Sequence, residues 1–413
     1  MPRIHPADEQ ATLDLATVNQ NGARTRAADL ILLLIISLIL LGFGVAIFLL
    51  PQESFSEQEN RTLQTMPALT LDVLTDNGLS RDVADFYADQ FPARSTLIDL
   101  KTLSEISLLR MENNGVLIGK NGYLIKRLEY GESEYENICK NLVAASAFTE
   151  SMAACGVPVT TAIAPRGIDV LYTYLPNYYA TDRVDAAWTV VMESSEQLGI
   201  APVTFTEELR GSAAVGTEVW FRTDHHWTPR GAYLAYMLLY DELGYYPMPL
   251  PMHFESLTAE TLDAPFYGTT YSSAGLSRAE ADTLTFYHIP EEERYLCEIV
   301  DTGKSFFGFY DRSYLEGKDK YGALIGGNNG RVRITDTAHP DKPTLLVIKD
   351  SFSHAMLPYL AQHFTLEIID LRYWRGSVTA LADEVDAEQV LILMGLDSMA
   401  SAPTLELLKY GMK

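Results

Sequence analysis

An aspartate, two histidines and a tryptophan follow one another in the segment "TDHHWTPRGAY" at 223–233. Asp224 and His226 are two residues apart, so in an extended chain their side chains point to one side and His225 points to the other. A carboxylate beside one imidazole nitrogen orients the ring and leaves the second nitrogen free to take a proton. Three interpretations compete for this segment: a buried structural cluster, a metal site, and the acid and base of a catalytic triad.

A serine that could serve as the nucleophile occurs in "TLLVIKDSFSHAML" at 344–357. The apolar run predicts a strand that ends at Asp350, with Ser351 at the start of a helix. Sites in open α/β sheets lie at the carboxyl ends of strands, and the free N–H groups of a helix start can stabilise an oxyanion. An ordinary helix cap would use the same residue types. Together with the first segment, the pattern predicts Ser351 as nucleophile, His226 as base and Asp224 as the acid that orients the base.

Other polar residues are candidates for binding a substrate. Arg166 and Arg372 follow predicted strands, where a cation could hold an acidic sugar or an acyl oxygen. Asn328 lies in the glycine-rich turn "IGGNNG" and could be a second oxyanion donor, although an ordinary tight turn has the same composition. Trp227 is a further candidate, which could stack on a sugar or simply pack its own loop. Adjacent histidines seldom bind one ion together, and no second cluster has metal-ligand spacing, so we expect neither a metal nor a cofactor.

The elements that must position these residues alternate along the chain. Continuous apolar strands between amphipathic helices predict a mostly parallel sheet with helices on both faces. The predicted strands are 157–165, 200–205, 344–350, 366–371 and 390–396, and the predicted helices are 134–154, 183–199, 229–244, 351–364 and 378–385. Helical segments on either side of Pro92 and a hairpin at 114–125 precede them. Residues 247–340 break the rhythm and are interpreted as an insertion.

The apolar run at 30–50 contains no charged residue and is long enough to span a bilayer. A buried helix and a cleaved signal peptide are the alternatives. Arginines precede the run, so the positive-inside rule places residues 1–29 in the cytoplasm and the remainder outside. We therefore expect a cytoplasmic tail at 1–29, a transmembrane helix at 30–50, a juxtamembrane helical region at 51–115 and an α/β domain at 116–413.

Composition narrows the possible functions further. The formal net charge is −24, with 55 acidic and 31 basic residues, which argues against nucleic-acid binding. The three cysteines fit no metal motif, and one disulfide would be possible.

The chain resembles the DHHW protein family, which is similar to the SGNH-hydrolase-like alginate O-acetylation proteins. Seven segments carry the resemblance, in family order: "SEQENRTL" (56–63), "DQFPARSTL" (89–97), "VLIGKNGYL" (116–124), "TDHHWTPRGAY" (223–233), "FYGTTYSSAG" (266–275), "YGALIGGNNG" (321–330) and "IKDSFSHAMLPYL" (348–360). The resemblance implies a flavodoxin-like α/β core and a triad of Asp224, His226 and Ser351, in which the nucleophile comes last. One departure is Lys349, which stands where the wider superfamily has glycine and could affect the approach of an acyl group.

By this resemblance, the expected function is a membrane-anchored, extracytoplasmic O-acetyltransferase that acts on a surface or exopolysaccharide. A multi-spanning membrane acyltransferase is the expected source of the acyl group. Two alternatives remain at this stage: a carbohydrate esterase, and a protein without catalysis that binds a polysaccharide or organises its synthesis. The separation between His226 and Ser351 distinguishes catalysis from binding alone.

Overall fold

The computed structural model describes residues 6–56, 61–67, 78–108, 110–181, 184–243, 250–276 and 279–410. The chain divides into two compact units, Met1–Lys101 and Thr102–Lys413, which are described separately.

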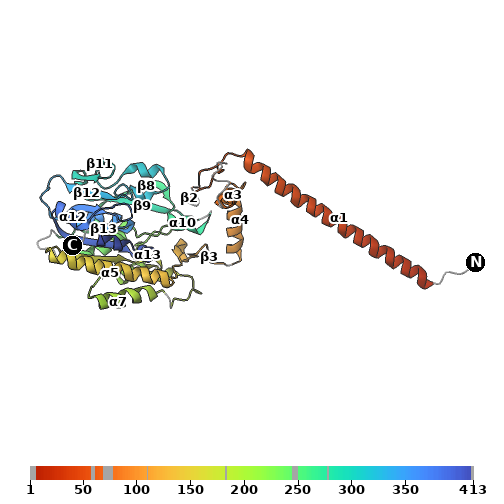
Figure 1. Cartoon of the computed structure of the whole chain (residues 1–413), viewed down its shortest axis with the longest axis horizontal. Helices are drawn as coiled ribbons and strands as arrows, with labels where there is room; N and C mark the ends of the chain where they lie inside the picture. The colour runs from red at the N-terminus through yellow and green to blue at the C-terminus, as the bar shows by residue number, and fades with distance from the viewer. Residues whose placement is uncertain are drawn as a thin grey trace, which may run out of the picture. The chain divides into compact units, whose positions relative to one another are not determined.

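The N-terminal unit is dominated by the helix α1 (Pro6–Leu49) (Figure 1). Its segment Ala28–Leu49 has 22 residues and a mean hydropathy of 3.1, so it is long and apolar enough to cross a membrane. A short antiparallel pair follows, β1 (Phe55–Ser56) with β2 (Arg61–Thr62). The helix α3 (Gly78–Asp89) and the start of α4 (Arg94–Ser107) flank Pro92, as predicted from the apolar spacing.

The larger unit contains an eight-stranded sheet in the order β11-β10-β12-β14-β13-β15-β6-β7. The five strands from β14 to β7 run parallel to one another, which confirms the predicted mostly parallel sheet. These strands are β6 (Val159–Ala164), β7 (Val203–Thr204), β13 (Thr344–Lys349), β14 (Thr365–Ile369) and β15 (Ala387–Gly395).

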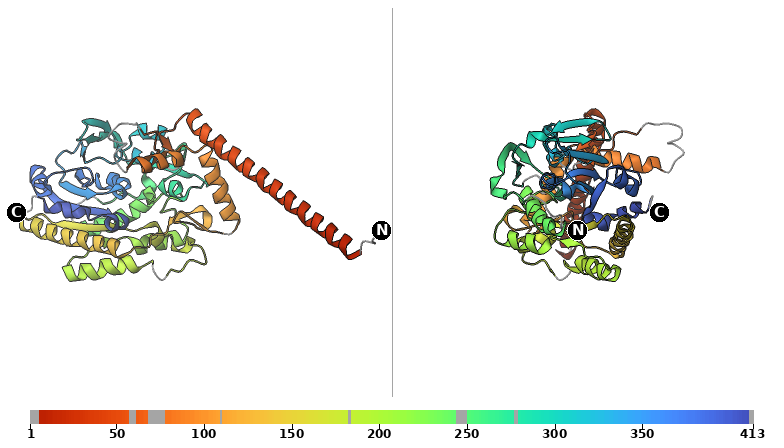
Figure 2. Two further views of the ribbon diagram at one scale, coloured as in Figure 1. Left: turned by 45° about the vertical axis from the view of Figure 1, so that its right-hand side comes forward. Right: turned by 90° about the vertical axis from the view of Figure 1, so that its left-hand side faces the viewer.

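Helices cover both faces of this sheet, because its central strands are apolar on both sides. Along β13, Leu345 and Val347 pack into one core and Leu346 and Ile348 into the other. The helices α5 and α7 lie against the second core, seen along one side of the sheet in Figures 1 and 2. The helices of the larger unit are α5 (Glu132–Ala154), α6 (Gly167–Val170), α7 (Ala186–Leu198), α8 (Thr206–Ala214), α9 (Pro229–Leu243), α10 (Thr269–Ala274), α11 (Leu357–Leu360), α12 (Val378–Glu384) and α13 (Leu396–Ser401).

Residues 247–340, interpreted from the sequence as an insertion, contribute to two sheets. Their strands β10 (Tyr295–Ile299), β11 (Lys304–Phe307) and β12 (Arg331–Asp336) continue the main sheet in antiparallel orientation beyond β14. The strands β8 (Thr258–Phe266) and β9 (Asp282–His288) form a separate antiparallel pair. The predicted hairpin near the start of the unit is also present, as part of a three-stranded sheet of β3 (Glu112–Asn113), β4 (Val116–Ile118) and β5 (Leu124–Lys126).

The segment 351–364 differs from the single helix expected there. It forms a 3-10 turn at Ser351–Ala355 and then the short α11. Pro358 lies in the first turn of α11 and has no N–H to donate to the preceding turn, so a continuous helix through it is disfavoured. All three cysteines carry free thiols.

Candidate active site

Ser351 lies two residues beyond the end of β13 (Thr344–Lys349), a central strand paired in parallel with both β14 and β15. The turn that presents it is held by Asp350, which is fully buried. One oxygen of this carboxylate accepts from the N–H of Phe352 at 3.0 Å, and the other accepts from the N–H of Gly395 at 2.7 Å. Asp350 therefore caps the turn and also fastens it to the end of the neighbouring strand.

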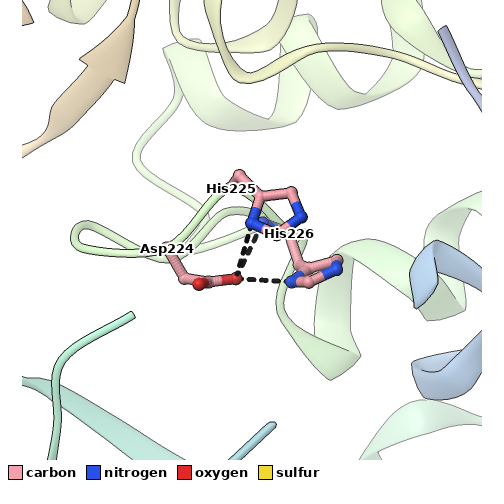
Figure 3. Close-up of side chains that lie close together, drawn as sticks. All are labelled: Asp224, His225 and His226. Atoms are coloured by element: carbon pink, nitrogen blue, oxygen red, sulfur yellow. Dashed lines mark hydrogen bonds and ion pairs between the residues drawn. The ribbon is translucent and has the colours of Figure 1, made fainter. Parts of the chain in front are cut away.

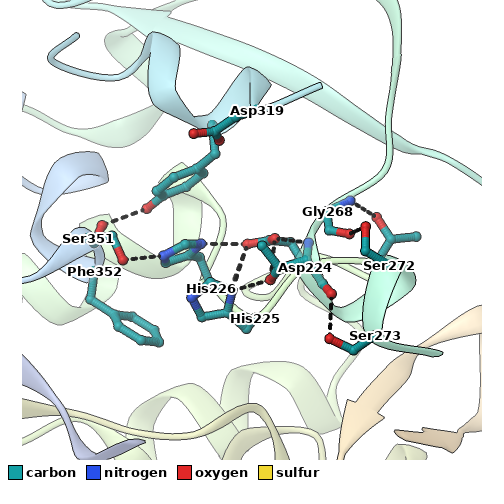
Figure 4. A network of polar contacts seen from close by, with 12 residues as sticks. Asp224, His225, His226, Gly268, Ser272, Ser273, Asp319, Ser351 and Phe352 are labelled. Atoms are coloured by element: carbon teal, nitrogen blue, oxygen red, sulfur yellow. Dashed lines mark hydrogen bonds and ion pairs between the residues drawn. The ribbon is translucent and has the colours of Figure 1, made fainter. Parts of the chain in front are cut away.

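His226 reaches the serine from the loop between α8 and α9. Its Nε2 lies 2.8 Å from Oγ of Ser351, and its Nδ1 lies 2.5 Å from Oδ1 of Asp224 (Figure 4). The same carboxylate oxygen accepts from the backbone N–H of His226 at 3.1 Å. The structure thus brings together the three residues that the sequence singled out, in the order acid, base and hydroxyl.

The second oxygen of Asp224 is held by Thr269, which lies in the segment "FYGTTYSSAG" but was given no role from the sequence. The backbone N–H of Thr269 donates to Oδ2 at 2.8 Å and its hydroxyl donates at 3.2 Å. Gly268 precedes it and packs directly on the carboxylate, since a Cβ built there would lie 2.6 Å from Cγ of Asp224. The carboxylate is therefore fixed on both sides, and the sequence "FYGTT" supplies the residues that fix it.

Burial controls the protonation of this pair. Burial lowers the pKa of His226 to about 4, and the neighbouring His225 adds to the effect, while Asp224 opposes it. Burial alone would raise the pKa of Asp224, but the two imidazoles and their hydrogen bonds outweigh it and hold that pKa well below the usual range. At neutral pH the pair consequently holds an ionised carboxylate beside a neutral imidazole, which is the state that a general base requires.

Aromatic side chains enclose the base. The ring of Tyr321 stacks on His226 with centroids 4.0 Å apart and planes 4° from parallel, and its hydroxyl donates to the carbonyl of Ser351 at 3.3 Å. Trp227 is fully buried, and its indole N–H donates to the carbonyl of Phe352 at 2.9 Å. This burial corrects the substrate-binding role considered for Trp227, because the ring has no exposed face on which a sugar could stack. Trp227 instead ties the histidine loop to the nucleophile turn.

His225 also differs from its expected position on the opposite face. Its ring lies beside that of His226, with centroids 3.7 Å apart (Figure 3). Residues 222–226 form a series of bends rather than an extended strand, so the two-residue alternation does not apply. The side chains of Asp224, His225 and His226 place one ligand atom each within 4.8 Å of one another, a spacing that could hold a metal ion. However, the oxygens of Asp224 are already occupied by N–H and O–H donors.

The remaining candidates are held by other polar groups, and Arg166 also lines a small cavity together with Asp224 and His225. Arg166 is buried and its donors are taken up by Asp169 at 2.7 and 3.0 Å and by the carbonyl of Val184 at 2.6 Å. Arg372 forms two bonds to Asp370, at 2.9 and 2.6 Å, and donates to Oδ1 of Asn328 at 3.3 Å. Arg166 is therefore an internal ion pair in this structure, whereas Arg372 and the exposed Asn328 form a polar pair at the end of β14.

Lys349, the departure from the glycine of the wider superfamily, is buried beneath the nucleophile turn. Its Nζ donates to Nε2 of His354 at 2.6 Å and lies 3.5 Å from Oδ2 of Asp370. Burial lowers its pKa to about 8, while the charge of Asp370 counteracts the shift. The ammonium is thus directed at His354 and Asp370.

Comparisons with known proteins agree with this architecture. The model of the DHHW protein family matches residues 189–369. No curated protein sequence gives a match. A solved DHHW family protein from Eubacterium siraeum is 22% identical, covers 73% of this chain and 97% of its own, and superposes with a TM-score of 0.57. PatB1 of Bacillus cereus, solved with a sulfonyl adduct, is 17% identical. The match covers 70% of this chain and 97% of PatB1, with a TM-score of 0.57.

The O-acetyltransferase domain of Pseudomonas putida AlgJ is a more distant match, 16% identical. The match covers 69% of this chain and 92% of that domain, and its TM-score of 0.43 is too low to support an inference. The first two likenesses show that this chain shares the fold of those two proteins. The resemblance to the DHHW protein family predicted from the sequence is confirmed over residues 189–369, the segment that contains Asp224, His226 and Ser351.

Proposed function

We propose that this chain is a membrane-anchored, extracytoplasmic O-acyltransferase that takes an acetyl group onto Ser351 and passes it to a hydroxyl of a surface or exopolysaccharide. The observation that carries the proposal is the hydrogen-bonded series from Asp224 through His226 to Oγ of Ser351. A spacing of 2.8 Å lies within the reach needed for proton transfer, which favours catalysis over polysaccharide binding alone.

The reaction proceeds in two halves. Oγ of Ser351 attacks the acyl carbonyl while its proton passes to Nε2 of His226, and Asp224 stabilises the imidazolium that forms. The imidazolium then protonates the leaving group, and the acetyl group stays on Ser351 as an ester. In the second half, an acceptor hydroxyl attacks this ester and gives its proton to His226, and collapse of the tetrahedral intermediate returns the proton to the serine.

The oxyanion formed in each half needs hydrogen-bond donors. Ser351 begins its turn, so its own N–H has no acceptor within that turn and is available to the oxyanion. Asn328, proposed from the sequence as a second donor, and Arg372 beside it are further candidates, as binding groups for the substrate.

The same groups would hydrolyse the acyl-enzyme if water attacked it, as in a carbohydrate esterase. Burial of the base favours transfer, because His226 is only 4% exposed and activation of bulk water by it is restricted. The apolar segment of α1 supports anchoring to a membrane. In the proposed topology residues 1–29 are cytoplasmic, and a multi-spanning membrane acyltransferase delivers the acyl group to the other side.

Acetylation of Ser351 tests the proposal directly. The full chain in detergent is mixed with p-nitrophenyl acetate, and the modified residue is located by mass spectrometry. We expect acetyl on Ser351 in the wild type, none at this position in Ser351→Ala, and loss of p-nitrophenol release in that variant. Ser401→Ala, at the end of α13, is the matched control because its exposed hydroxyl bonds only within its own helix. Unchanged turnover in Ser351→Ala would end the proposal.

A further inference from the structure

His225 lies in the candidate site but has no part in the proton transfers proposed above. Its ring lies against that of His226, and both rings turn their Nδ1 toward Asp224, at 3.7 Å for His225 and 2.5 Å for His226. The two differ in exposure: the side chain of His225 is 28% exposed and that of His226 is 5% exposed. His225 is therefore the imidazole of the pair that a ligand can reach.

The hydrogen bonds of Thr269 define which nitrogen of His225 carries the proton. The single hydroxyl hydrogen of Thr269 is donated to Oδ2 of Asp224, so Oγ1 acts as the acceptor toward Nδ1 of His225 at 2.5 Å. A carboxylate oxygen on the same side also favours a proton on Nδ1. In the neutral ring the lone pair then lies on Nε2.

This Nε2 faces away from Asp224, on the same side as the nitrogen by which His226 meets Ser351 (Figures 3 and 4). Within the described part of the chain, no group forms a hydrogen bond with it. The ring also lines a cavity of about 20 Å³, whose walls include Asp224, Phe352 and the ionisable side chains of Arg166 and Asp397. A space of this size has room for one water molecule or hydroxyl group.

We propose that His225 selects the acceptor: its Nε2 accepts a hydrogen bond from one hydroxyl of a vicinal diol, while the adjacent hydroxyl attacks the acetyl group on Ser351. The attacking oxygen forms the new ester bond, its proton passes to Nε2 of His226, and the bond to Oγ of Ser351 breaks. The hydroxyl on His225 keeps its proton. Two acceptor nitrogens on neighbouring rings match the paired hydroxyls of a sugar, whereas water and simple alcohols offer only one hydroxyl. The inference rests on the proposed acyl transfer.

Two simple alcohols test this selection. The full chain is acetylated with p-nitrophenyl acetate in the presence of either 1,2-ethanediol or ethanol, and the acetate ester formed with each alcohol is measured. The ratio of the two is internal to each variant, so changes in the acylation of Ser351 cancel. We expect the wild type to favour the diol, per hydroxyl group, by roughly tenfold, which is the value of one good hydrogen bond.

A pair of isosteric variants separates selection from a structural role. His225→Gln places its amide, with an oxygen able to accept, at the position of Nε2, whereas the shorter His225→Asn places its amide at the position of Nδ1 and leaves no polar group at that of Nε2. We expect His225→Gln to keep the preference for the diol. In His225→Asn the diol and ethanol should react equally well per hydroxyl group. A structural role through Thr269 would give the reverse order.

Equal preferences in both variants and the wild type, or no diol preference in the wild type, would overturn the inference and leave the acyl transfer standing. If both variants fail to fold, the presence or absence of a diol preference in the wild type still tests the inference. Absence of acetyl on Ser351 in the wild type would instead refute the proposed function itself, and an acyl-enzyme that reacts only with water would end both.

Discussion

The carboxylate of Asp224 is packed so closely that one added methyl group tests its role. In Gly268→Ala the new Cβ would lie 2.6 Å from Cγ of Asp224 and closer still to Oδ2. Carbon atoms in contact are about 3.5–4.0 Å apart, so the carboxylate must move by about 1 Å. The backbone at Gly268 has a φ of −83° and a ψ of −171°, which alanine adopts without strain. The effect of the substitution is therefore steric and is directed at Asp224.

Such a displacement would weaken the bonds from Thr269 and misalign His226. A misplacement of 1 Å in a catalytic arrangement costs on the order of 100-fold in rate, or about 2.7 kcal/mol of activation free energy. We expect kcat/KM for p-nitrophenyl acetate to fall by roughly this factor in Gly268→Ala.

Gly211→Ala in α8 is the matched control, because a Cβ there meets no atom within 4 Å. The thermal unfolding of both variants, measured alongside, shows whether the fold is intact. A folded Gly268→Ala variant with the activity of the wild type would refute the reasoning that a fixed Asp224 orients the base.

Two further predictions concern the base. Because burial lowers the pKa of His226 to about 4, the neutral base persists well below neutral pH, and the acetylation rate of Ser351 should fall only as the pH drops through about 4; an acid limb near pH 6.5, the value of a free imidazole, would contradict this. Tyr321→Leu removes the ring that stacks on His226 and should slow acetylation by roughly tenfold at neutral pH, since an aromatic face stabilises an adjacent cation by about 1–2 kcal/mol. Tyr321→Phe keeps the ring and should retain most of the rate, and equal losses in both would assign the effect to the hydroxyl.

The parts of the molecule that follow local periodicity could be predicted from the sequence. The apolar runs that become β13 and β15 end one residue before the predicted ends at 350 and 396, and they could be found because strands buried on both faces have few polar residues. Ser351 was singled out for the same reason, as the first hydroxyl after such a run. Asp224 and His226 were found through their residue types and close spacing.

The supporting groups could not be found in this way, because long-range packing positions them. Gly268, Thr269 and Tyr321 come from the segment 247–340, for which no helix or strand was predicted from the sequence. The glycine before two threonines, Gly268, has no evident role in the sequence. Only the fold brings it against Asp224, which lies 44 residues before it in the chain. The predicted position of His225 was wrong for a related reason, because it assumed that side chains alternate in a segment that in fact bends.

From the sequence, Lys349 could affect the approach of an acyl group to Ser351. The packing of its side chain addresses this question. A lysine at this point would obstruct an acyl group only if its side chain turned toward Ser351, but its ammonium is buried and directed at Asp370 and His354. A buried charge is retained when it is paired, and here Asp370 also binds Arg372, which in turn holds Asn328. The lysine therefore links the strand that carries the nucleophile to the polar pair proposed to bind substrate, a connection that glycine could not make.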